Sequence, residues 1–462
     1  MRLLAFIANP RASRRLLTDA ARTCALRMAP SLLLLIRKLA LAAGATGLGL
    51  RVLMAEHRLS GGARLTAEVR RRLPQIFDHL DTLIAPADIA HLPRILHHRA
   101  IVLQAPTVSG DRIRRGVLLI KFTESFRFFY HHVDVEKLLR YFRVVLEPSW
   151  SGYCLPDILF WCRYGKPVVV QASEPLDRRF LEELDTSLVP ICVGASDWVD
   201  HRVFQPLGLQ RDFDVIYVAN LSPIKRVHVY LKTLGEIVAR RGSVRAALVM
   251  GGWGGDKSTF DELLNLYSLH DQVEVFMNLK QPQLNELLNR ARVSVLLSKK
   301  EGSNKTLFES MFADTPVLLV KDNIGVNKDY INEHTGMLVA EDEFAAAIER
   351  FMDAPPPLSP RTWAMANIAP EITARKLQAL LDELYPEDAT TTAALWPKVN
   401  TPEATYMDPA IAAQLPDIAD TMSCFLRRDA SDASEESTAL HMQNLFGQVP
   451  AGRAGAGRVL AD

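Results

Sequence analysis

The chain has 462 residues, of which 48% are hydrophobic and 23% are charged, as expected of a globular protein with two to three domains. Its 54 basic and 53 acidic residues give a net charge of +1, so no overall field attracts nucleic acid, and we expect no nucleic-acid partner. The five cysteines form no Cys-x-x-Cys pair and have no histidines at metal-ligand spacing. We therefore expect reduced thiols, a cytoplasmic location and no bound metal.

Residues 1–48 are basic and rich in apolar side chains. They contain eight arginines and lysines and one acid, Asp19, while 30–50 is apolar except for Arg37, Lys38 and a few small residues. Neither a membrane-spanning helix, which needs about 20 apolar residues without central charges, nor a secretory signal fits this pattern. Two interpretations stay open. The segment forms packed helices of an extended first domain, or it contacts anionic lipid at the inner face of the membrane.

The first 205 residues alternate short aliphatic runs with stretches of helical spacing. This pattern predicts buried parallel strands in a doubly wound α/β domain over 1–205, with 1–48 as an extension. Amphipathic helices are predicted over 64–80 and 135–141. The predicted strands are 3–7, 51–54, 82–85, 100–104, 116–122, 142–147 and 167–171.

A second series of the same kind predicts another α/β domain over 211–352. Its strands are predicted at 214–218, 246–250, 272–276, 293–297, 316–320 and 337–339, and its helices at 227–240, 260–269, 283–290 and 305–313. The region 353–385 reads as a proline-stiffened linker followed by an amphipathic helix over 371–384. The rest, 386–462, is polar and low in complexity, and we expect it to be disordered.

The most informative segment is 298–317, which follows a predicted strand and opens a helix. Residues 302–304 predict a tight turn and a helix cap. The amides from Asn304 to Thr306 would then form a helix amino terminus at the carboxyl end of a parallel strand, where such sheets hold phosphate.

Two glutamates flank this turn. Glu309 lies one turn inside the helix, where a carboxylate suits the two hydroxyls of a ribose. Glu301 precedes the turn and stands nearer to the group beyond the phosphates. By itself, this pair fits equally well a capped helix with two surface acids.

The segment resembles the motif of the group 1 glycosyltransferases (glycosyltransferase family 4), roughly S-x-x-E-G-F-G-x-x-x-x-E-A-M-A-x-G-x-P-V. The matching residues are Ser298, Glu301, Gly302, Glu309, Met311, Ala313, Pro316 and Val317. Three more segments resemble family motifs in the same order. Residues 217–225 resemble G-R-L-x-P-x-K-G through Pro223 and Lys225, 248–275 resembles the glycine-rich turn with its helix and strand, and 334–339 resembles N-G-L-L-V.

The resemblance implies a GT-B fold, in which two Rossmann-like doubly wound domains face each other across a cleft and a last helix returns to the first domain. It implies a hexosyltransferase-like enzyme of polysaccharide biosynthesis that moves a sugar from a nucleotide-diphosphate sugar to a glycan or lipid-linked glycan. The family retains the anomeric configuration and uses neither a cofactor nor a metal, since cations and helix amides offset the charge of the leaving diphosphate.

Residue roles follow from the same resemblance. Lys225 would contact the diphosphate, Glu301 the transferred sugar and Glu309 the ribose, and Lys225 and Glu301 are the candidate catalytic residues. The candidate donor-binding residues are Asn220, Lys225, Arg226, Gly252, Glu301, Gly302, Ser303, Asn304, Lys305, Thr306 and Glu309.

The chain departs from the family pattern in three places. Asn220 replaces an arginine and Arg226 replaces a glycine, so one phosphate-facing cation is lost, and Arg226 or Lys305 is the candidate replacement. The pair at 303–304 replaces Phe-Gly, and Asp314 replaces a glycine. These changes leave the nucleotide-sugar interpretation in place without indicating which sugar is moved.

Candidates in the first domain have weaker support, because each fits a structural role equally well. The four cleft candidates are Gly61, Gly62, Lys121 and Glu174. The two glycines follow the predicted strand 51–54 and resemble the family's first glycine loop. His131 and His132 lie in a predicted helix, where a packed or solvated role is favoured.

Four rival functions compete with this interpretation. The segment 251–258 resembles a P-loop, but Asp256 stands where the glycine before the lysine is required, which disfavours an NTPase. A dehydrogenase is also disfavoured, because Lys257 occupies the last glycine position of G-x-G-x-x-G. A sugar-nucleotide epimerase and a non-catalytic nucleotide-sugar-binding protein stay open as alternatives on the same fold.

Overall fold

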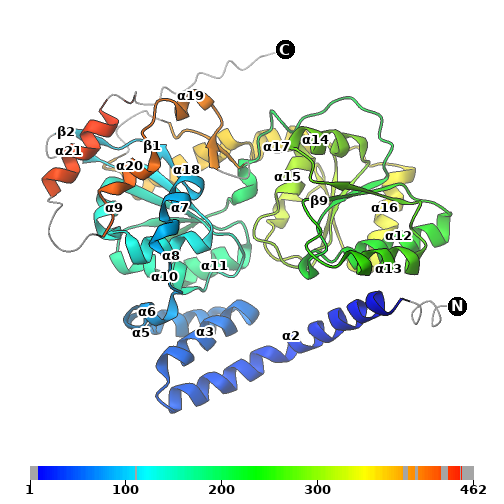
Figure 1. Ribbon diagram of the computed structural model, residues 1–462, viewed down its shortest axis with the longest axis horizontal. Coiled ribbons are helices and arrows are strands. Elements are labelled where there is room, and N and C mark those ends of the chain that lie inside the picture. Colours follow the sequence, from blue (N-terminus) through cyan, green and yellow to red (C-terminus); the bar gives the residue numbers. More distant parts are fainter. Residues whose placement is uncertain are drawn as a thin grey trace. The chain divides into compact units, whose positions relative to one another are not determined.

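The computed structural model describes residues 9–109, 112–388, 394–400, 404–427, 435–447 and 449. The chain divides into two compact α/β units (Figure 1), unit 1 from residues 1–30 and 199–369 and unit 2 from residues 31–198 and 370–462. The first boundary falls inside helix α2 (Pro10–Ala42), directly after Pro30. The predicted strand 3–7 lies outside the described residues.

Unit 1 is built on a six-stranded parallel sheet in the order β10-β9-β8-β11-β12-β13. The strands are β8 (Val215–Val218), β9 (Ala246–Met250), β10 (Val273–Met277), β11 (Ser294–Leu296), β12 (Val317–Val320) and β13 (Gly336–Val339). Most of their side chains are buried, as expected of strands that helices cover on both faces. The strand order reverses between β8 and β11, so the loops that follow these two strands leave the same edge of the sheet side by side.

The helices of unit 1 match the predicted ones to within three residues at each end where a helix was predicted. They are α12 (Val227–Arg241), α13 (Lys257–Tyr267), α14 (Gln281–Arg290), α15 (Lys305–Phe312), α16 (Phe344–Asp353) and α17 (Pro360–Asn367), with short 3-10 helices η4 (Pro223–Lys225), η5 (Lys328–Tyr330) and η6 (Glu341–Glu343). The α/β fold class is confirmed for this unit.

Unit 2 contains a five-stranded sheet in the order β1-β4-β5-β6-β7. The strands are β1 (Ala100–Gln104), β4 (Gly116–Lys121), β5 (Phe142–Glu147), β6 (Val168–Gln171) and β7 (Leu188–Ile191), and a separate hairpin joins β2 (Thr107–Ser109) to β3 (Arg112–Arg114). The edge strand β1 is antiparallel to β4, while the other pairs are parallel. The sequence did not indicate the antiparallel edge, the hairpin or β7.

Helices cover both faces of this sheet. They include α8 (Thr123–His132), α9 (Val135–Tyr141), α10 (Pro156–Leu159), α11 (Pro175–Leu184) and α18 (Pro370–Leu384), with 3-10 helices η2 (Phe160–Tyr164) and η3 (Ala195–Trp198). Leu377 and Leu381 of α18 are fully buried against Leu103, Leu119 and Val145 of the sheet. The amphipathic pattern at 371–384 therefore packs on unit 2.

Two strands predicted before residue 99 are wrong. The run 51–54 lies in helix α3 (Thr46–Ser60), and 82–85 begins within helix α6 (Leu80–Leu83). Leu50, Leu53 and Met54 are buried at helical spacing, so this apolar run is one face of a helix. The other helical elements before β1 are α4 (Ala63–Arg71), α5 (Leu73–Asp78), η1 (Ile89–His91) and α7 (Leu92–Arg99).

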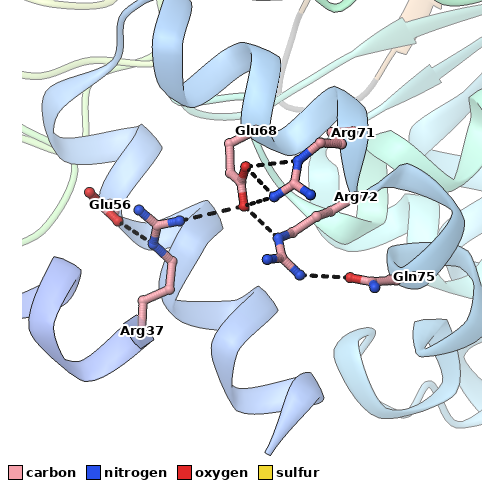
Figure 2. A network of polar contacts seen from close by, with 6 residues as sticks. All are labelled: Arg37, Glu56, Glu68, Arg71, Arg72 and Gln75. Carbon is pink, nitrogen blue, oxygen red and sulfur yellow. Dashed lines mark hydrogen bonds and ion pairs between the residues drawn. The ribbon is translucent and has the colours of Figure 1, made fainter. Parts of the chain in front are cut away.

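The second half of α2 belongs to unit 2, and an ion-pair network holds it there (Figure 2). The Nε atom of Arg37 lies 2.9 Å from Oε2 of Glu56, and its Nη1 atom lies 3.7 Å from Oε1 of Glu68. Glu68 also pairs with Arg71 and Arg72 of its own helical region. Arg37 is therefore half-buried and paired, which explains a charge within an apolar stretch. Of the helices that the structure describes, none has the length and apolarity to cross a bilayer.

The expectation of disorder after residue 385 is wrong for the part that the structure describes. Strand β14 (Lys398–Asn400) pairs with β15 (Ala404–Tyr406), and helices α19 (Pro409–Ala412), α20 (Ile418–Ser423) and α21 (Glu435–Phe446) follow. Trp396, Phe425 and Met442 join the core of unit 2. The backbone amide of Trp396 donates a hydrogen bond of 2.8 Å to Leu103. The sequence missed this because the few apolar residues that fill the core are widely spaced.

Candidate functional site

The carboxyl ends of β8 and β11 bring the two predicted catalytic residues together. The ammonium group of Lys225, on η4 after β8, lies 2.7 Å from Oε1 and 3.0 Å from Oε2 of Glu301, which follows β11. The side chain of Glu301 is 6% exposed and that of Lys225 is 22% exposed. We call Lys225, Ser298, Glu301, Asn304 and Glu309 the switch-point cluster, because they surround the point where the strand order reverses.

Neighbouring groups fix the position of both charges. The hydroxyl of Ser298 donates to Oε1 of Glu301 at 2.6 Å, and the buried hydroxyl of Tyr217 donates to the backbone carbonyl of Lys225. The amide of Glu301 donates to the carbonyl of Ile324 at 2.7 Å, so the loop after β12 supports the loop after β11. Tyr217 was not singled out from the sequence, although its place one residue before the end of β8 is where such a support would be found.

The helix that begins at Lys305 has the cap that the sequence predicted. Oδ1 of Asn304 accepts a hydrogen bond of 3.2 Å from the amide of Leu307. Glu309 is buried one turn later, and burial raises the pKa of its carboxyl group above the ordinary value of 4.5, while Lys305 and the hydroxyl of Thr306 oppose the shift. Lys305 and Thr306 offset only part of the cost of burying this carboxylate. It is therefore suited to accept hydrogen bonds from a ligand.

The turn and the first helical residues are partly exposed. Gly302, Ser303, Lys305 and Thr306 are each half-buried, between the buried Glu301 and the buried Glu309. The structure thus gathers the predicted turn into one surface at the carboxyl edge of the sheet. Their roles in binding a donor stay predictions.

Arg226 does not contribute an additional unpaired cation to this surface. Its Nη2 atom lies 2.9 Å from both carboxylate oxygens of Glu341, and its Nη1 atom donates to the carbonyl of Leu297 at 3.3 Å. Its backbone has φ of 51°, the left-handed conformation that explains why a glycine would fit at this position. Glu341, which the sequence did not indicate, therefore holds the Arg226 guanidinium group in an ion pair, and the choice between Arg226 and Lys305 as the replacement cation stays a prediction.

The remaining two donor candidates lie in the loops beside the cluster. Oδ1 of Asn220 accepts a hydrogen bond of 3.1 Å from the amide of Ser222 and so shapes the loop after β8. Gly252, in the loop after β9, has φ of 130° and no neighbour that would meet a Cβ atom. Asn220 also stands against Gly254, where a Cβ atom would come within 2.6 Å of its side chain.

The prediction of a glycine loop after a strand in unit 2 is wrong. Gly61 ends helix α3 and Gly62 precedes helix α4, so they join two helices and follow no strand. Both have positive φ, which the sharp turn between the helices requires. Their resemblance to the family's first glycine loop rested on the wrong strand at 51–54.

Lys121 and Glu174 lie at the carboxyl edge of the second sheet, at or after the ends of β4 and β6, and both are buried. Oε1 of Glu174 accepts from the amide of Leu176 and caps α11, which is a structural role. The Lys121 ammonium lies 5.2 Å from the ring centre of Phe122, a residue with φ of 67°. A bulky residue in the left-handed region is strained, and such strain is typical of functional loops.

The sequence missed two further features of this edge. Glu147, at the end of β5, is buried and paired with Lys398 of β14 at 2.7 Å, so it is not available as a surface acid. Trp150 follows in the next loop and is 45% exposed. The carboxylate of Asp177 holds that loop by accepting from the amides of Gly152 and Tyr153.

Other sequence candidates have structural roles. His131 and His132 contact the carbonyls of Ala85 and Ala87 through Nε2 at 3.1 Å and 2.7 Å. Asp256 caps α13 by accepting from the amide of Ser258 at 3.1 Å, so it does not form a P-loop. In the described part of the chain, no three His, Cys, Asp or Glu residues are grouped so as to hold a metal ion, and metal independence stays a prediction.

Comparisons with known proteins point to the same part of the chain. Residues 201–366 match the family model "Glycosyl transferases group 1". Spore coat protein SA of Bacillus subtilis (strain 168) is 26% identical over 141 residues, which is 29% of this chain and 37% of that protein. This chain therefore spans little more than a third of that relative.

Sucrose-phosphate synthase from Thermosynechococcus elongatus is similar with a TM-score of 0.47 and 17% identity, over 58% of this chain and 73% of that one. HepE of Anabaena, solved in complex with UDP-glucose, has a TM-score of 0.44 and 15% identity, over 57% and 78% of the two chains. Residues 201–366, which contain every member of the switch-point cluster, are therefore the part of this chain that is similar to the glycosyl transferases of group 1.

Proposed function

We propose that this protein is a glycosyltransferase that moves a hexose from a nucleotide-diphosphate sugar to a glycan or lipid-linked glycan, without a metal and with retention of anomeric configuration. The observation that carries the proposal is the pairing of Lys225 with Glu301 at the reversal of strand order, beside the capped start of α15. Parallel sheets bind nucleotides at this point.

Three groups in the switch-point cluster match the three parts of such a donor. Lys225 and the first amides of α15 offer positive charge to a diphosphate, and Lys305 adds a cation at the same helix end. Glu309 is one turn further and suits the ribose hydroxyls. Glu301 lies on the other side of the turn, where its carboxylate accepts hydrogen bonds from hydroxyls of the sugar.

The chemistry asked of these residues is charge stabilisation. As the bond from sugar to diphosphate breaks, negative charge grows on the leaving oxygens, and Lys225 stabilises this charge more in the transition state than in the ground state. Binding of a diphosphate gives Lys225 a second anionic partner, while Ser298 continues to hold Glu301 in place. The acceptor would bind through unit 2, where Lys121 and Trp150 lie at the carboxyl edge of the sheet.

A donor panel tests this proposal. UDP-, GDP- and ADP-sugars are added to the full chain, and one of them is expected to raise the melting temperature, because a ligand that binds only the folded state stabilises it. Glu309→Ala should weaken binding of that donor by roughly 10- to 150-fold, from the loss of about 1.5–3 kcal/mol. The matched control is Glu333→Ala, because the side chain of Glu333 is 83% exposed and outside the cluster. Unchanged donor binding in a folded Glu309→Ala variant would contradict the placement of the ribose.

Radiolabelled donor then separates transfer from the alternatives. A transferase moves label to an acceptor and releases nucleotide faster when acceptor is present, whereas an epimerase turns over without any acceptor. A binding protein shows donor-dependent stabilisation but no turnover under either condition. Lys225→Ala should lower the turnover number more than it weakens donor binding.

A membrane-surface contact through residues 1–48 belongs to the same proposal. On α2, Leu32, Leu35 and Leu39 are 59%, 54% and 60% exposed at helical spacing, and the exposed Lys38 lies next to this row. An apolar row beside positive charge suits a bilayer with anionic lipids. The full chain should float with phosphatidylserine-containing vesicles, and Leu35→Gln/Leu39→Gln should not. Equal flotation of both proteins would contradict this contact.

A further inference from the structure

Unit 1 contains a cavity of about 530 Å³ that lies apart from the switch-point cluster. It opens between the first turns of α2, the loop after β8, the loop after β9 and the start of α13. The volume falls within the range of about 300–1,000 Å³ that is typical of small-molecule sites. None of the members of the switch-point cluster lines it. We call it the arginine cavity.

Helix α2 is anchored beside α13 by its own first turn (Figure 1). Oε2 of Glu262, on α13, accepts hydrogen bonds from the amides of Arg11 and Ala12 at 2.6 Å and 3.0 Å. A carboxylate at this position satisfies two amides that have no partner inside the helix and complements the helix dipole. Ala12 and Ser13 are buried by this packing. The anchor brings one face of α2 to the cavity.

That face supplies a cationic wall. Arg11, Arg14 and Arg15 line the cavity, and Thr18 continues the wall one turn later. Arg11 lies 4.0 Å from Glu262, so its charge is partly offset. Among the side chains that the structure describes, no carboxylate pairs with Arg14. Guanidinium groups gathered in this way favour an anion between them, because like charges repel each other.

The other walls are mainly apolar, with one acid. The apolar lining comes from the loop after β8 (Leu221 and Pro223), the start of α12 (Val227) and α13 (Phe260). The single carboxylate in the lining is that of Asp256, which accepts hydrogen bonds from Ser258 and Thr259 at the start of α13 and also interacts electrostatically with Arg11. The cavity therefore combines a cationic wall with an apolar one, which is the chemistry of a ligand with a phosphate at one end.

We propose that the arginine cavity binds an organic phosphate, with Arg14 and Arg15 contacting the phosphate and Leu221 and Phe260 contacting the organic part. Guanidinium groups bind phosphate oxygens in pairs, which makes arginine the preferred side chain for this task. The site adjoins the donor loop, because Pro223 lines the cavity while Lys225, in the same short helix, pairs with Glu301. The ligand is a second phosphate compound or a phosphate of a lipid headgroup.

The first experiment measures pyrophosphate binding by titration calorimetry at low ionic strength. It uses the full chain with Lys225→Ala, so that the donor loop contributes little. Adding Arg14→Gln/Arg15→Gln should weaken binding at least about tenfold, since two charge-assisted contacts are lost. The control adds Lys38→Gln/Arg64→Gln, which removes two exposed charges outside the cavity and should change the affinity less than about twofold. Equal affinity of the Arg14→Gln/Arg15→Gln protein and the control would overturn the proposal.

Circular dichroism and the melting temperature establish that each variant is folded, and Arg14→Lys/Arg15→Lys supplies a second test. This variant keeps both charges, so it should retain more pyrophosphate affinity than the glutamine variant while still falling below the parent. A complete absence of binding in Lys225→Ala alone would also overturn the proposal, because it would assign all binding to the donor loop.

The second experiment identifies the source of the phosphate. Dihexanoyl phosphatidic acid, as a lipid phosphate, and ribose 5-phosphate, as a soluble one, are titrated into the same proteins. The ligand that matches the cavity should bind more tightly than pyrophosphate and lose this advantage in Leu221→Ala, which shortens the apolar wall. If neither ester binds more tightly than pyrophosphate, the proposed contact of the organic part with Leu221 and Phe260 is wrong. Nucleotide-sugar binding by Arg14→Gln/Arg15→Gln is measured in parallel. This measurement distinguishes a failure of the arginine-cavity proposal from a failure of the proposed transferase function.

Discussion

Gly325 lies directly against the backbone of Glu301: a Cβ atom at position 325 would come within 2.0 Å of the carbonyl oxygen of Glu301. Gly325 also has φ of 112°, a conformation that side chains with a Cβ atom rarely adopt. The loop after β12 therefore fits the loop after β11 only if this residue is glycine. The position of Glu301 depends on a residue that lies 24 positions later in the sequence.

The first prediction follows from this contact. Gly325→Ala should displace the loop that carries Glu301, lower stability by about 3 kcal/mol or more, and reduce donor turnover. Gly242→Ala is the matched control, since Gly242 also has positive φ but meets no neighbouring atom, and it should cost only about 1 kcal/mol. Urea unfolding and donor turnover of the two variants test the difference. Equal losses would show that backbone conformation, and not the collision, sets the cost.

The second prediction concerns pH and Glu309. Burial raises the pKa of this carboxyl group above 4.5, so its protonated form favours the folded state, and that stabilisation is lost as pH rises through the folded pKa. Donor affinity should change in the opposite direction, because the carboxylate is the form that accepts two ribose hydrogen bonds. Calorimetry from about pH 5 to about pH 8 should show affinity rising with pH in the parent protein but not in Glu309→Gln. An equal rise of donor affinity with pH in both proteins would show that Glu309 is not the group responsible.

The third prediction concerns His57 in unit 2. Burial lowers the pKa of this imidazole from 6.5 to about 4, although Glu183 opposes the shift. The neutral ring therefore stabilises the fold above pH 6.5, and this contribution is lost as pH falls from 6.5 toward 4. As pH falls over that interval, the free energy of unfolding should drop by about 1–2 kcal/mol less in His57→Gln than in the parent protein. Urea denaturation of both proteins at the two ends of the pH interval measures this difference. An identical drop in the free energy of unfolding would contradict the role given to His57.

The fourth prediction tests the network in Figure 2. Arg37→Ala leaves Glu56, with a side chain only 8% exposed, without its ion pair and should cost about 3–5 kcal/mol. Lys38→Ala, an exposed neighbour on the same helix, should change stability by less than about 0.5 kcal/mol. Double substitution of Arg37→Met with Glu56→Gln should recover part of the loss. Two single variants of equal stability would show that the pair contributes nothing.

The fifth prediction tests whether the last part of the chain is structural. Lys398 is fully buried and pairs with Glu147, so Lys398→Met should cost about 3–5 kcal/mol by leaving a buried carboxylate without its cation. Glu147→Gln in the same protein should restore much of that loss. If Lys398→Met unfolds at the parent denaturant concentration, β14 does not support the sheet as the structure indicates.

Much of unit 1 could be predicted because its signals are local. Continuous apolar strands, the Asn304 cap and the turn at 302–304 each lie within a few residues of one another. The orientation of Arg226 could not be predicted, since its partner Glu341 is far away in the sequence and belongs to no motif. The same holds for Gly325, whose contact with Glu301 exists only after folding.

Unit 2 was predicted less well, for two physical reasons. The run 51–54 is short, and a short apolar run fits a strand or a helix face equally until its neighbours are placed. The residues after 385 supply isolated core side chains such as Trp396 and Met442, which leave no periodic pattern. The pairing of Glu147 with Lys398 could not be predicted, because Lys398 lies in that part of the chain.

The division of the chain between units has a consequence for its synthesis on the ribosome. The segment 199–369 and the residues before 31 are synthesised before residue 370, so unit 1 can complete its core before unit 2 does. Unit 2 cannot, because α18, β14 and α21 are synthesised after all of unit 1. Until then β1 and β5 lack the apolar side chains of α18 and of the later segments that cover them, so we expect nascent unit 2 to be prone to aggregation.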